Sequence, residues 1–255
     1  MLSARQQHCL KGIGITQWQT RPSAEDAADG LAELEQTDTV ATPAPIEQPP
    51  TQDVVAPAAA TTENKAYNVD DWPQTLQAIE ACRNCSLAES CTRKVPGKGF
   101  QQADLMIVGE APGRDEDIQG LPFVGRAGKL LDKMLQAIDL DLDKVYITNI
   151  LKCRPPNNRD PRPEEVQACS QFLKAQIALV QPKVMLSVGR ISAQNLLREQ
   201  SPLGRLRTRQ HTLPDTRIPL LVTYHPAYLL RNPADKSKVW DDLKNLQRIL
   251  QHATD

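Results

Sequence analysis

The 255-residue sequence lacks a run of 18 apolar residues and lacks an apolar stretch near its N-terminus. It therefore predicts neither a membrane span nor a secretory signal, and we expect a cytoplasmic protein. Cysteine is also scarce, with six residues in the whole chain, too few for a disulfide scaffold. In a cytosolic protein, paired cysteines more often bind a metal or take part in redox chemistry.

Aromatic residues make up only 4% of the chain, and the shortage is greatest at the front. Residues 1–66 contain one aromatic residue (Trp18), six prolines, four basic and nine acidic side chains, whereas the remaining 189 residues carry a net charge of +4. The composition of residues 23–66, rich in Ala, Thr, Pro, Glu and Gln, predicts a disordered linker. Residues 67–255 are long enough to bury a core of their own, which leaves residues 1–22 as a separate short segment.

Apolar runs rich in β-branched residues alternate with helical patterns after residue 67. The runs predict strands at residues 105–108, 145–148, 184–188 and 220–223. The helical patterns cover residues 72–81, 127–138, 163–180, 191–198 and 235–250. This alternation predicts an α/β fold with a parallel sheet covered by helices on both faces.

Polar residues follow three of the predicted strands. Gly109 and Glu110 end the first strand, Asn149 ends the second, and His225 follows the fourth. In open parallel sheets the ligand site lies at the carboxyl ends of the strands, so we expect these residues to share one site.

Four segments resemble motifs of the uracil-DNA glycosylase superfamily, specifically its family 4 iron–sulfur enzymes. They are GEAPGRDED (109–117), PFVGRAGKLLD (122–132), TNILKCRPPNNRDP (148–161) and HPAYLLR (225–231), and the resemblance extends over residues 76–250. It implies a three-layer α/β/α sandwich around a four-stranded parallel sheet. It also implies a monofunctional base excision repair enzyme, which flips uracil out of DNA and hydrolyses its N-glycosidic bond to leave an abasic site.

The resemblance assigns three residues to the uracil base. Phe123 would stack on it, and the Asn149 amide would pair with its N3–H and O4 while presenting the wrong pattern to cytosine. His225 would donate to O2, where negative charge develops as the bond breaks. For each residue a purely structural role is the alternative: a buried packing residue, a strand cap and a core histidine.

The first motif departs from the best-known branch of the superfamily at two positions. Ala111 stands where that branch has an aspartate that activates water, so Glu110 is the first choice for that role, with Asp115 and Asp117 as alternatives. Gly113 stands where that branch has a bulky ring that excludes the methyl group of thymine. The backbone at Gly109, Ala111 and Gly113 would line the base pocket, and strict rejection of thymine is not predicted.

The segment after His225 resembles the family's DNA-inserting loop. Leu229 or Leu230 would fill the gap left by the extruded base, and Arg231 would clamp DNA; the alternative is that both leucines face the core. Because the net charge of the body is modest, DNA affinity must come from a local basic patch. Other candidates for phosphate contact are Arg126, Arg154, Arg159 and Arg190.

The cysteine spacing resembles the ligand set of the family 4 cluster. Cys82 and Cys85 form a C-x2-C pair, and Cys153 and Cys169 follow later in the chain. Four thiolates suit a [4Fe–4S] cluster, and structural zinc is the alternative because it accepts the same donors. Cys91 and Cys9 fall outside the spacing and are expected to be free thiols.

Residues 10–21 resemble the N-terminal peptide of the psi subunit of the bacterial replicative clamp loader, chiefly in Gly14–Trp18 and Arg21. This resemblance suggests a bacterial, nucleoid-associated enzyme that is recruited to replication machinery by an aromatic anchor on a flexible tether. An unused leader is the alternative.

Two further expectations follow. The partner is uracil-containing DNA, and nothing in the sequence demands more than a monomer. Ala111 and the clamp-loader-like peptide keep one rival function open, a non-catalytic iron–sulfur DNA-binding or replication accessory protein.

Overall fold

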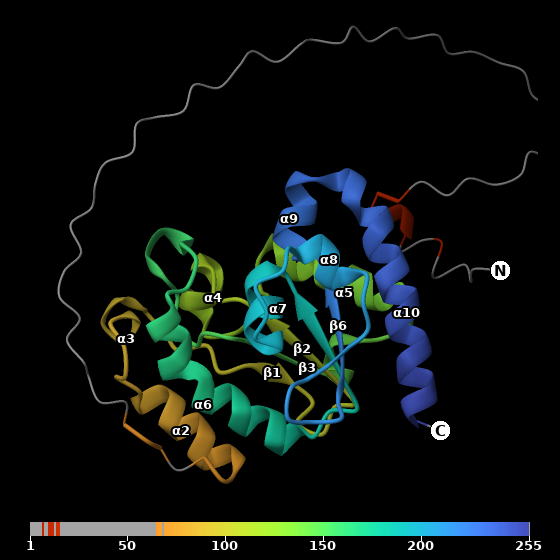
Figure 1. Cartoon of the computed structure of the whole chain (residues 1–255). Coiled ribbons are helices and arrows are strands. Elements are labelled where there is room, and N and C mark those ends of the chain that lie inside the picture. Colours follow the sequence, from red (N-terminus) through yellow and green to blue (C-terminus); the bar gives the residue numbers. More distant parts are fainter. Residues whose placement is uncertain (1–6, 8–9, 13, 16–64, 68, 255) are drawn as a thin grey trace, which may run out of the picture. The chain divides into compact units, whose positions relative to one another are not determined.

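The computed structural model describes residues 7, 10–12, 14–15, 65–67 and 69–254. A central sheet crosses the molecule, with helices on both sides (Figure 1). The strands are β1 (Lys98–Gly99), β2 (Leu105–Gly109), β3 (Val145–Asn149), β4 (Val184–Val188), β5 (His211–Thr212) and β6 (Pro219–Thr223). The helices are α2 (Trp72–Ala81), α3 (Leu87–Ser90), α4 (Arg114–Gln119), α5 (Arg126–Gln136), α6 (Pro163–Val180), α7 (Arg190–Leu197), α8 (Leu203–Arg207), α9 (Pro226–Arg231) and α10 (Lys236–Thr254), with short 3-10 turns η1 (Leu142–Lys144), η2 (Pro156–Asn158) and η3 (Pro233–Asp235).

The predicted α/β architecture is confirmed. The strand order is β1-β3-β2-β4-β6-β5, and the four central strands are parallel, as predicted. The sheet also has two antiparallel edge strands, β1 and β5, for which the sequence shows no strand pattern. Each is only two residues long, so neither shows an alternating pattern from which a strand could be recognised.

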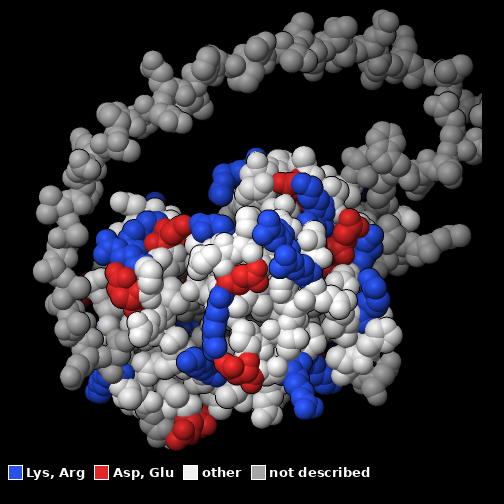
Figure 2. Space-filling model, in the orientation of Figure 1, with Lys and Arg blue, Asp and Glu red and all other residues white. Residues whose placement is uncertain are grey.

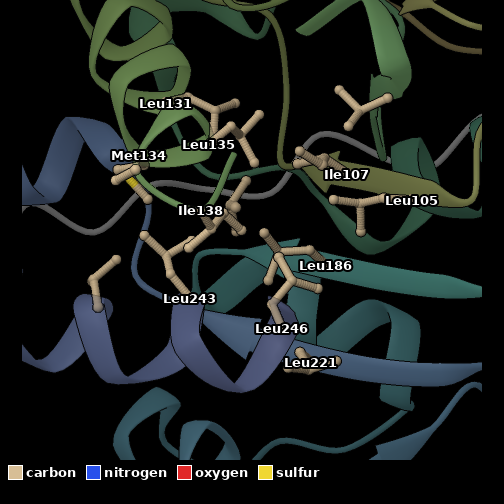
Figure 3. Packing of buried hydrophobic residues seen from close by; sticks show 14 of the residues in the cluster. Leu105, Ile107, Leu131, Met134, Leu135, Ile138, Leu186, Leu221, Leu243 and Leu246 are labelled. Carbon is tan, nitrogen blue, oxygen red and sulfur yellow. The ribbon is translucent and has the colours of Figure 1, made fainter. Parts of the chain in front are cut away.

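The central strands are buried on both faces because their side chains alternate between two cores. One core joins β2, β3, β4 and β6 to α5 and α10, and Figure 3 shows Leu131 and Leu135 of α5 facing Leu243 and Leu246 of α10. The other core packs the opposite faces of the same strands against α6 and α7. The sheet is therefore held rigidly from both sides, and its carboxyl edge forms a fixed base for the loops.

Local sequence signals explain where two of these helices begin. Asp71 caps α2 by accepting the backbone N–H of Gln74 at 2.8 Å. Helix α6 starts at Pro163, and the Glu165 side chain reaches back to the Arg162 N–H at 2.8 Å. These caps fix the starts of α2 and α6; Cys82 directly follows α2, and Cys169 lies on α6.

A short N-terminal turn packs against the body of the protein. Residues 10–12 are helical, and the turn closes through hydrogen bonds from the Gly14 N–H to the Lys11 oxygen and from the Ile15 N–H to the Leu10 oxygen, both 3.0 Å. Gly14 has φ +77°, the left-handed conformation of a helix end. Leu10 is 1% exposed within the α5–α10 core, so part of the predicted recruitment peptide is docked on its own chain. Residues 16–64, with Trp18 and nearly all of the predicted linker, lie outside the described residues.

Charges of both signs are interspersed on the surface that Figure 2 shows, with blue Lys and Arg side chains covering more of that face than red Asp and Glu side chains. Among the described helices, none combines the length and apolar character needed to cross a membrane.

Candidate active site

A cavity of about 420 Å³ lies at the carboxyl edge of the sheet, among the segments that follow β2, β3 and β6. It is lined by Glu110, Ala111, Pro112, Gly113, Glu116, Phe123, Ala127, Asn149, Pro155, Asn158, Arg159, Asp160, His225, Ala227, Tyr228 and Arg231. Its size is within the range of small-ligand sites. The residues that the sequence assigned to a base therefore share one cavity.

Sheet register brings the first two site segments together. Gly109 of β2 is the direct partner of Asn149 on β3, and Asn149 is 2% exposed. A Cβ atom at position 109 would overlap Asn149 Oδ1 and would lie 3.0 Å from the Phe123 ring. Glycine is therefore required at position 109, because it lets the amide and the aromatic ring approach over the strand end.

Phe123 is held in a strained turn. Its φ is +52°, an uncommon conformation for a bulky residue, and its side chain is 8% exposed. The Glu116 carboxylate accepts the backbone N–H groups of Val124 (3.1 Å) and Gly125 (3.3 Å), which fixes the turn. Gly128 of α5 packs directly against the Phe123 carbonyl, where a Cβ atom would overlap. Such strain is typical of functional sites.

His225 caps the N-terminus of α9 and faces Phe123. The two ring centroids are 5.7 Å apart with an interplanar angle of 29°. His225 Nδ1 accepts the Ala227 backbone N–H at 3.1 Å, so the neutral ring carries its proton on Nε2. Burial, and then the charge of Arg231, lowers the pKa of His225 to about 4. At neutral pH the ring is therefore an uncharged donor.

Glu110 is a partly buried carboxyl group in the same cavity. Burial, reinforced by the Asp160 carboxylate and opposed by Arg190, raises the pKa of Glu110 to about 7. Arg190 Nη2 lies 2.6 Å from Asp160 Oδ2, so this ion pair partly offsets the repulsion. A carboxyl group with a pKa near neutrality is suited to proton transfer.

The other residues of the first motif differ in what they contact. Ala111 lines the cavity and also packs against the group of buried residues that contains the cysteines. A Cβ at Gly113 would lie 2.7 Å from Glu116 Oε2, so the space beside this glycine is taken by a carboxylate. Asp117 faces away and accepts both the backbone N–H (2.9 Å) and the hydroxyl (2.8 Å) of Thr92. Neither Asp117 nor Asp115 is among the residues that line the cavity.

The predicted DNA-inserting residues lie on α9 with different exposures. Leu229 is 1% exposed and belongs to the core, as the structural alternative proposed, whereas Leu230 is only partly buried. Arg231 is exposed and reaches the cavity. Of the two leucines, Leu230 is the more exposed, although it borders the same core.

The predicted phosphate contacts also divide into two groups. Arg159 forms a two-pronged pair with Glu165, with one N–O distance of 2.9 Å, and Arg190 pairs with Asp160. Arg154 donates to the neutral Asn158 side chain at 2.8 Å, and Arg126 is exposed. Arg126 and Arg154 are therefore the members of this set that do not neutralise a carboxylate in the described ion pairs.

A second cavity is lined by all four of the predicted cysteine ligands, Cys82, Cys85, Cys153 and Cys169. Cys82 ends α2, Cys85 lies in the following turn, Cys153 follows β3 and Cys169 lies on α6. The backbone N–H groups of Leu87 and Ala88 are directed at the Cys85 sulfur. Such N–H···S contacts stabilise thiolates around iron–sulfur clusters. Among the described residues, no set of three or more His, Cys, Asp or Glu side chains is arranged to hold a single metal ion; the cysteines surround a cavity instead.

Cys91, expected to be a free thiol, lies beside this centre without lining its cavity. Its sulfur contacts that of Cys153 and accepts the Lys94 Nζ at 3.5 Å. Cys9 lies outside the described residues.

Four cavity residues with polar side chains were not singled out from the sequence: Glu116, Asn158, Asp160 and Tyr228. All four occur within the quoted motifs, so the signal was present, but nothing in the local pattern shows which motif side chains face the cavity. Tyr228 stacks on Tyr224 with centroids 5.1 Å apart and donates to Asp235 at 2.7 Å, and these two contacts hold its part of the cavity wall in place.

Comparison with known proteins agrees with this geometry. Residues 96–244 match the model of the uracil DNA glycosylase superfamily. A type-4 uracil-DNA glycosylase of Archaeoglobus fulgidus is 42% identical over 180 residues, covering 68% of this chain and 90% of that protein. Those of Sulfurisphaera tokodaii and Saccharolobus solfataricus are each 38% identical, covering 71% of this chain and 86% and 88% of those proteins. The chain therefore belongs to the uracil-DNA glycosylase superfamily and, within it, to the type-4 uracil-DNA glycosylases.

Proposed function

We propose that the cavity at the carboxyl edge of the sheet receives a uracil base rotated out of DNA. The chain is a uracil-DNA glycosylase, a hydrolase of N-glycosyl bonds that acts in DNA repair. The observation that carries the assignment of its site is that Phe123, Asn149 and His225 reach one cavity from segments far apart in the chain. Extrusion is required because the bond to be cleaved is inaccessible within the stacked duplex.

Phe123 and Asn149 select the base. The Phe123 ring provides a flat apolar surface for stacking, and its strained turn prevents it from collapsing into the cavity. The Asn149 amide offers one donor and one acceptor, which match O4 and N3–H of uracil and mismatch cytosine. Because Asn149 is buried at a strand end, an unmatched base would leave buried polar atoms without partners.

His225 stabilises the leaving group. Cleavage places negative charge on uracil O2, and the Nε2–H of a neutral His225 is a preorganised donor for that oxygen. The Ala227 N–H fixes the tautomer, and contact with Gly189, where a Cβ would lie 3.1 Å from His225 Cβ, fixes the position of the ring. A neutral donor can act over the whole physiological pH range.

Glu110 positions the attacking water. It is the carboxyl group of the first motif that both lines the cavity and has a pKa raised toward neutrality, to about 7. Asp117 is unsuited to this role because its two oxygens are already engaged by Thr92. A dissociative reaction requires only weak base strength, so orientation of the water is the main contribution.

Leu230 and Arg231 engage DNA as the base leaves the stack. Leu230 is the apolar wedge, since Leu229 is committed to the core, and Arg231 clamps the backbone at the rim of the cavity. Arg126 and Arg154 supply further phosphate contacts. All of these residues come from one chain, which is consistent with a monomeric enzyme.

We propose that Cys82, Cys85, Cys153 and Cys169 hold a [4Fe–4S] cluster, with zinc as the less favoured alternative. Four thiols around one buried cavity, with backbone N–H groups directed at a sulfur, fit such a group. When bound, the cluster would tie α2 and α6 to the loop after β3. A purified protein with broad visible absorption and four bound irons supports this assignment, and a colourless zinc protein refutes it.

We also propose that residues 10–21 recruit the enzyme to the clamp loader. Leu10 and Ile15 pack on the enzyme itself, so we assign the contact with the partner to the rest of the motif, residues 16–21, with Trp18 as the anchor. Loss of clamp-loader pull-down on Trp18→Ala would support recruitment. Absence of binding by the intact N-terminal peptide would refute it.

The function is tested with oligonucleotides that carry uracil opposite guanine, opposite adenine or unpaired, with thymine and hypoxanthine as controls. We expect alkali-labile abasic sites from the wild type, and excision at least 100-fold slower in Asn149→Ala and in His225→Ala with the visible absorption unchanged. Asn195→Ala, in α7 and outside the cavity, is the matched control. Wild-type rates in either site variant would contradict the role of that residue. DNA binding without abasic sites would indicate an accessory protein instead.

A further inference from the structure

Lys152 is a buried lysine that the proposed reaction does not use. It is 1% exposed and lies between the two cavities, three residues after Asn149 and immediately before Cys153. Its Nζ contacts the Thr148 hydroxyl (2.6 Å), the main-chain oxygen of Asn149 (2.7 Å) and Gln176 Oε1 (2.8 Å). A lysine is rarely buried so completely unless it is paired.

The hydrogen-bond partners around Nζ fit the ammonium form of Lys152. The Thr148 hydroxyl donates its own hydrogen to the Pro96 carbonyl at 2.7 Å. The Gln176 amide donates from Nε2 to the same carbonyl at 2.7 Å, which leaves its Oε1 as an acceptor. With these two donations, each of the three partners of Nζ presents an acceptor oxygen, which matches the three hydrogens of an ammonium group.

This buried cation has only neutral oxygens as hydrogen-bond partners. None of the ion pairs in the described part of the chain includes Lys152. On its other side, Lys152 lines the cavity of the four cysteines, and its backbone N–H is directed at the Cys169 sulfur. A buried charge without a counter-charge is strongly destabilising, so the thiolates of the proposed centre are the anion that this lysine needs.

We propose that Lys152 is the internal counter-cation of the four-thiolate centre and a positioning residue for Asn149, so that the filled centre holds the base-reading amide in place. The inference rests on the cluster proposed above. Lys152 Nζ donates to the main-chain carbonyl of Asn149, the residue proposed to pair with uracil. Two backbone hydrogen bonds hold the same segment, from Ile150 N–H to the Gly109 oxygen and from Leu151 N–H to the Glu110 oxygen, both 3.0 Å. One ammonium group therefore both balances the charge of the thiolates and holds the backbone of the base pocket.

A second lysine, Lys94, lines the same cavity but lacks the contact with the base pocket that Lys152 makes. Lys94 is also buried and lines the cavity, but its Nζ contacts Cys91 and reaches no residue of the base pocket. Of these two lysines, Lys152 is the one that contacts both sides, with its backbone N–H at Cys169 and its Nζ at the Asn149 carbonyl.

The test uses the full-length, cluster-loaded protein with Lys152→Met, which removes the charge and all three donors, and Lys152→Gln, which removes the charge but keeps an amide donor. Lys174→Met, which removes an exposed lysine from the same helix as Gln176, is the control. Two quantities are measured: the reduction potential of the cluster and the single-turnover rate of uracil excision.

We expect the potential to become more negative in both Lys152 variants, because an electron added to the cluster then has one fewer positive charge beside it. We expect excision to slow at least tenfold in Lys152→Met, less in Lys152→Gln, and not at all in Lys174→Met. An unchanged potential in both Lys152 variants, or excision within threefold of wild type in Lys152→Met, would overturn the inference. A wild-type protein that excises uracil but holds no cluster would refute the proposed centre, and the inference with it, while leaving the glycosylase function standing.

Discussion

As pH rises, Glu110 lowers the free energy of unfolding and His225 raises it. The substitution Glu110→Gln removes the first contribution, so that the second can be measured alone. The carboxyl of Glu110 ionises at about 7 in the folded protein against an ordinary pKa of 4.5, so its favourable contribution is complete below pH 4.5 and is lost as pH rises to about 7. The pKa of His225 falls from 6.5 to about 4, so its contribution is complete above pH 6.5 and is lost as pH falls to about 4. In the wild type, the loss of stability with rising pH that Glu110 causes is largely offset by the gain that His225 causes.

The magnitude follows from the change in pKa. For Glu110, the rise from 4.5 to about 7 corresponds to about 3 kcal/mol at full burial. Since part of the carboxyl remains in contact with solvent, we expect about 2 kcal/mol. Glu110→Gln should therefore be as stable as wild type at pH 4.5 and about 2 kcal/mol more stable at pH 8, a rise in Tm of about 6 °C.

The assay is thermal unfolding of wild type and Glu110→Gln between pH 4 and 8, with the exposed Glu80→Gln as control. The control should change Tm by the same small amount at every pH. Single-turnover excision over the same range should rise with a midpoint near pH 7 in wild type, and in Glu110→Gln it should be slow and without that rise. Unfolding curves for Glu110→Gln and wild type that stay parallel from pH 4.5 to 8 would refute the reasoning.

Three further outcomes are expected. Leu229→Ala should lower stability by about 3 kcal/mol because it empties a core position, whereas Leu230→Ala removes a side chain that only borders that core, so it should lower Tm less and slow excision from double-stranded DNA; equal effects on Tm would contradict their assignment to core and wedge. Gly128→Ala should lower stability by about 2 kcal/mol and slow excision, because its Cβ would overlap the Phe123 carbonyl; chemical denaturation and uracil release measure the two effects, and an unchanged protein would show that the turn is adaptable. Cys169→Ser should abolish the visible absorption and lower Tm, as measured by spectroscopy and thermal melts of freshly purified protein; a coloured variant with four irons would exclude this cysteine as a ligand.

Much of the fold could be predicted because its central elements are long and periodic. The strands β2, β3, β4 and β6 and the helices α2 and α6 agree with the expected ranges to within one residue. The elements that were missed are short: β1 and β5 have two residues each, and α3, α4, α8 and α9 have four to six. A segment of this length completes less than two helical turns or one strand repeat, so its conformation depends on what it packs against.

The N-terminal peptide is another short segment whose structure depends on what it packs against. Residues 10–21 contain few apolar side chains, too few to form a core by themselves. Leu10 is nevertheless buried, because it fills a position in the core formed by α5 and α10, more than a hundred residues later in the chain.

The sequence by itself determined which chemical groups this protein has and their order along the chain: an aromatic ring, an amide, an imidazole and four thiols, placed at strand ends and helix ends by local patterns of apolar residues. Only the tertiary structure decided what each group contacts. It committed Asp117 to Thr92 and Leu229 to the core, and placed Lys152 between Asn149 and the cysteines. The physical reason is that pKa values and access to solvent are set by neighbours brought together across the sheet, and these neighbours are distant in the sequence.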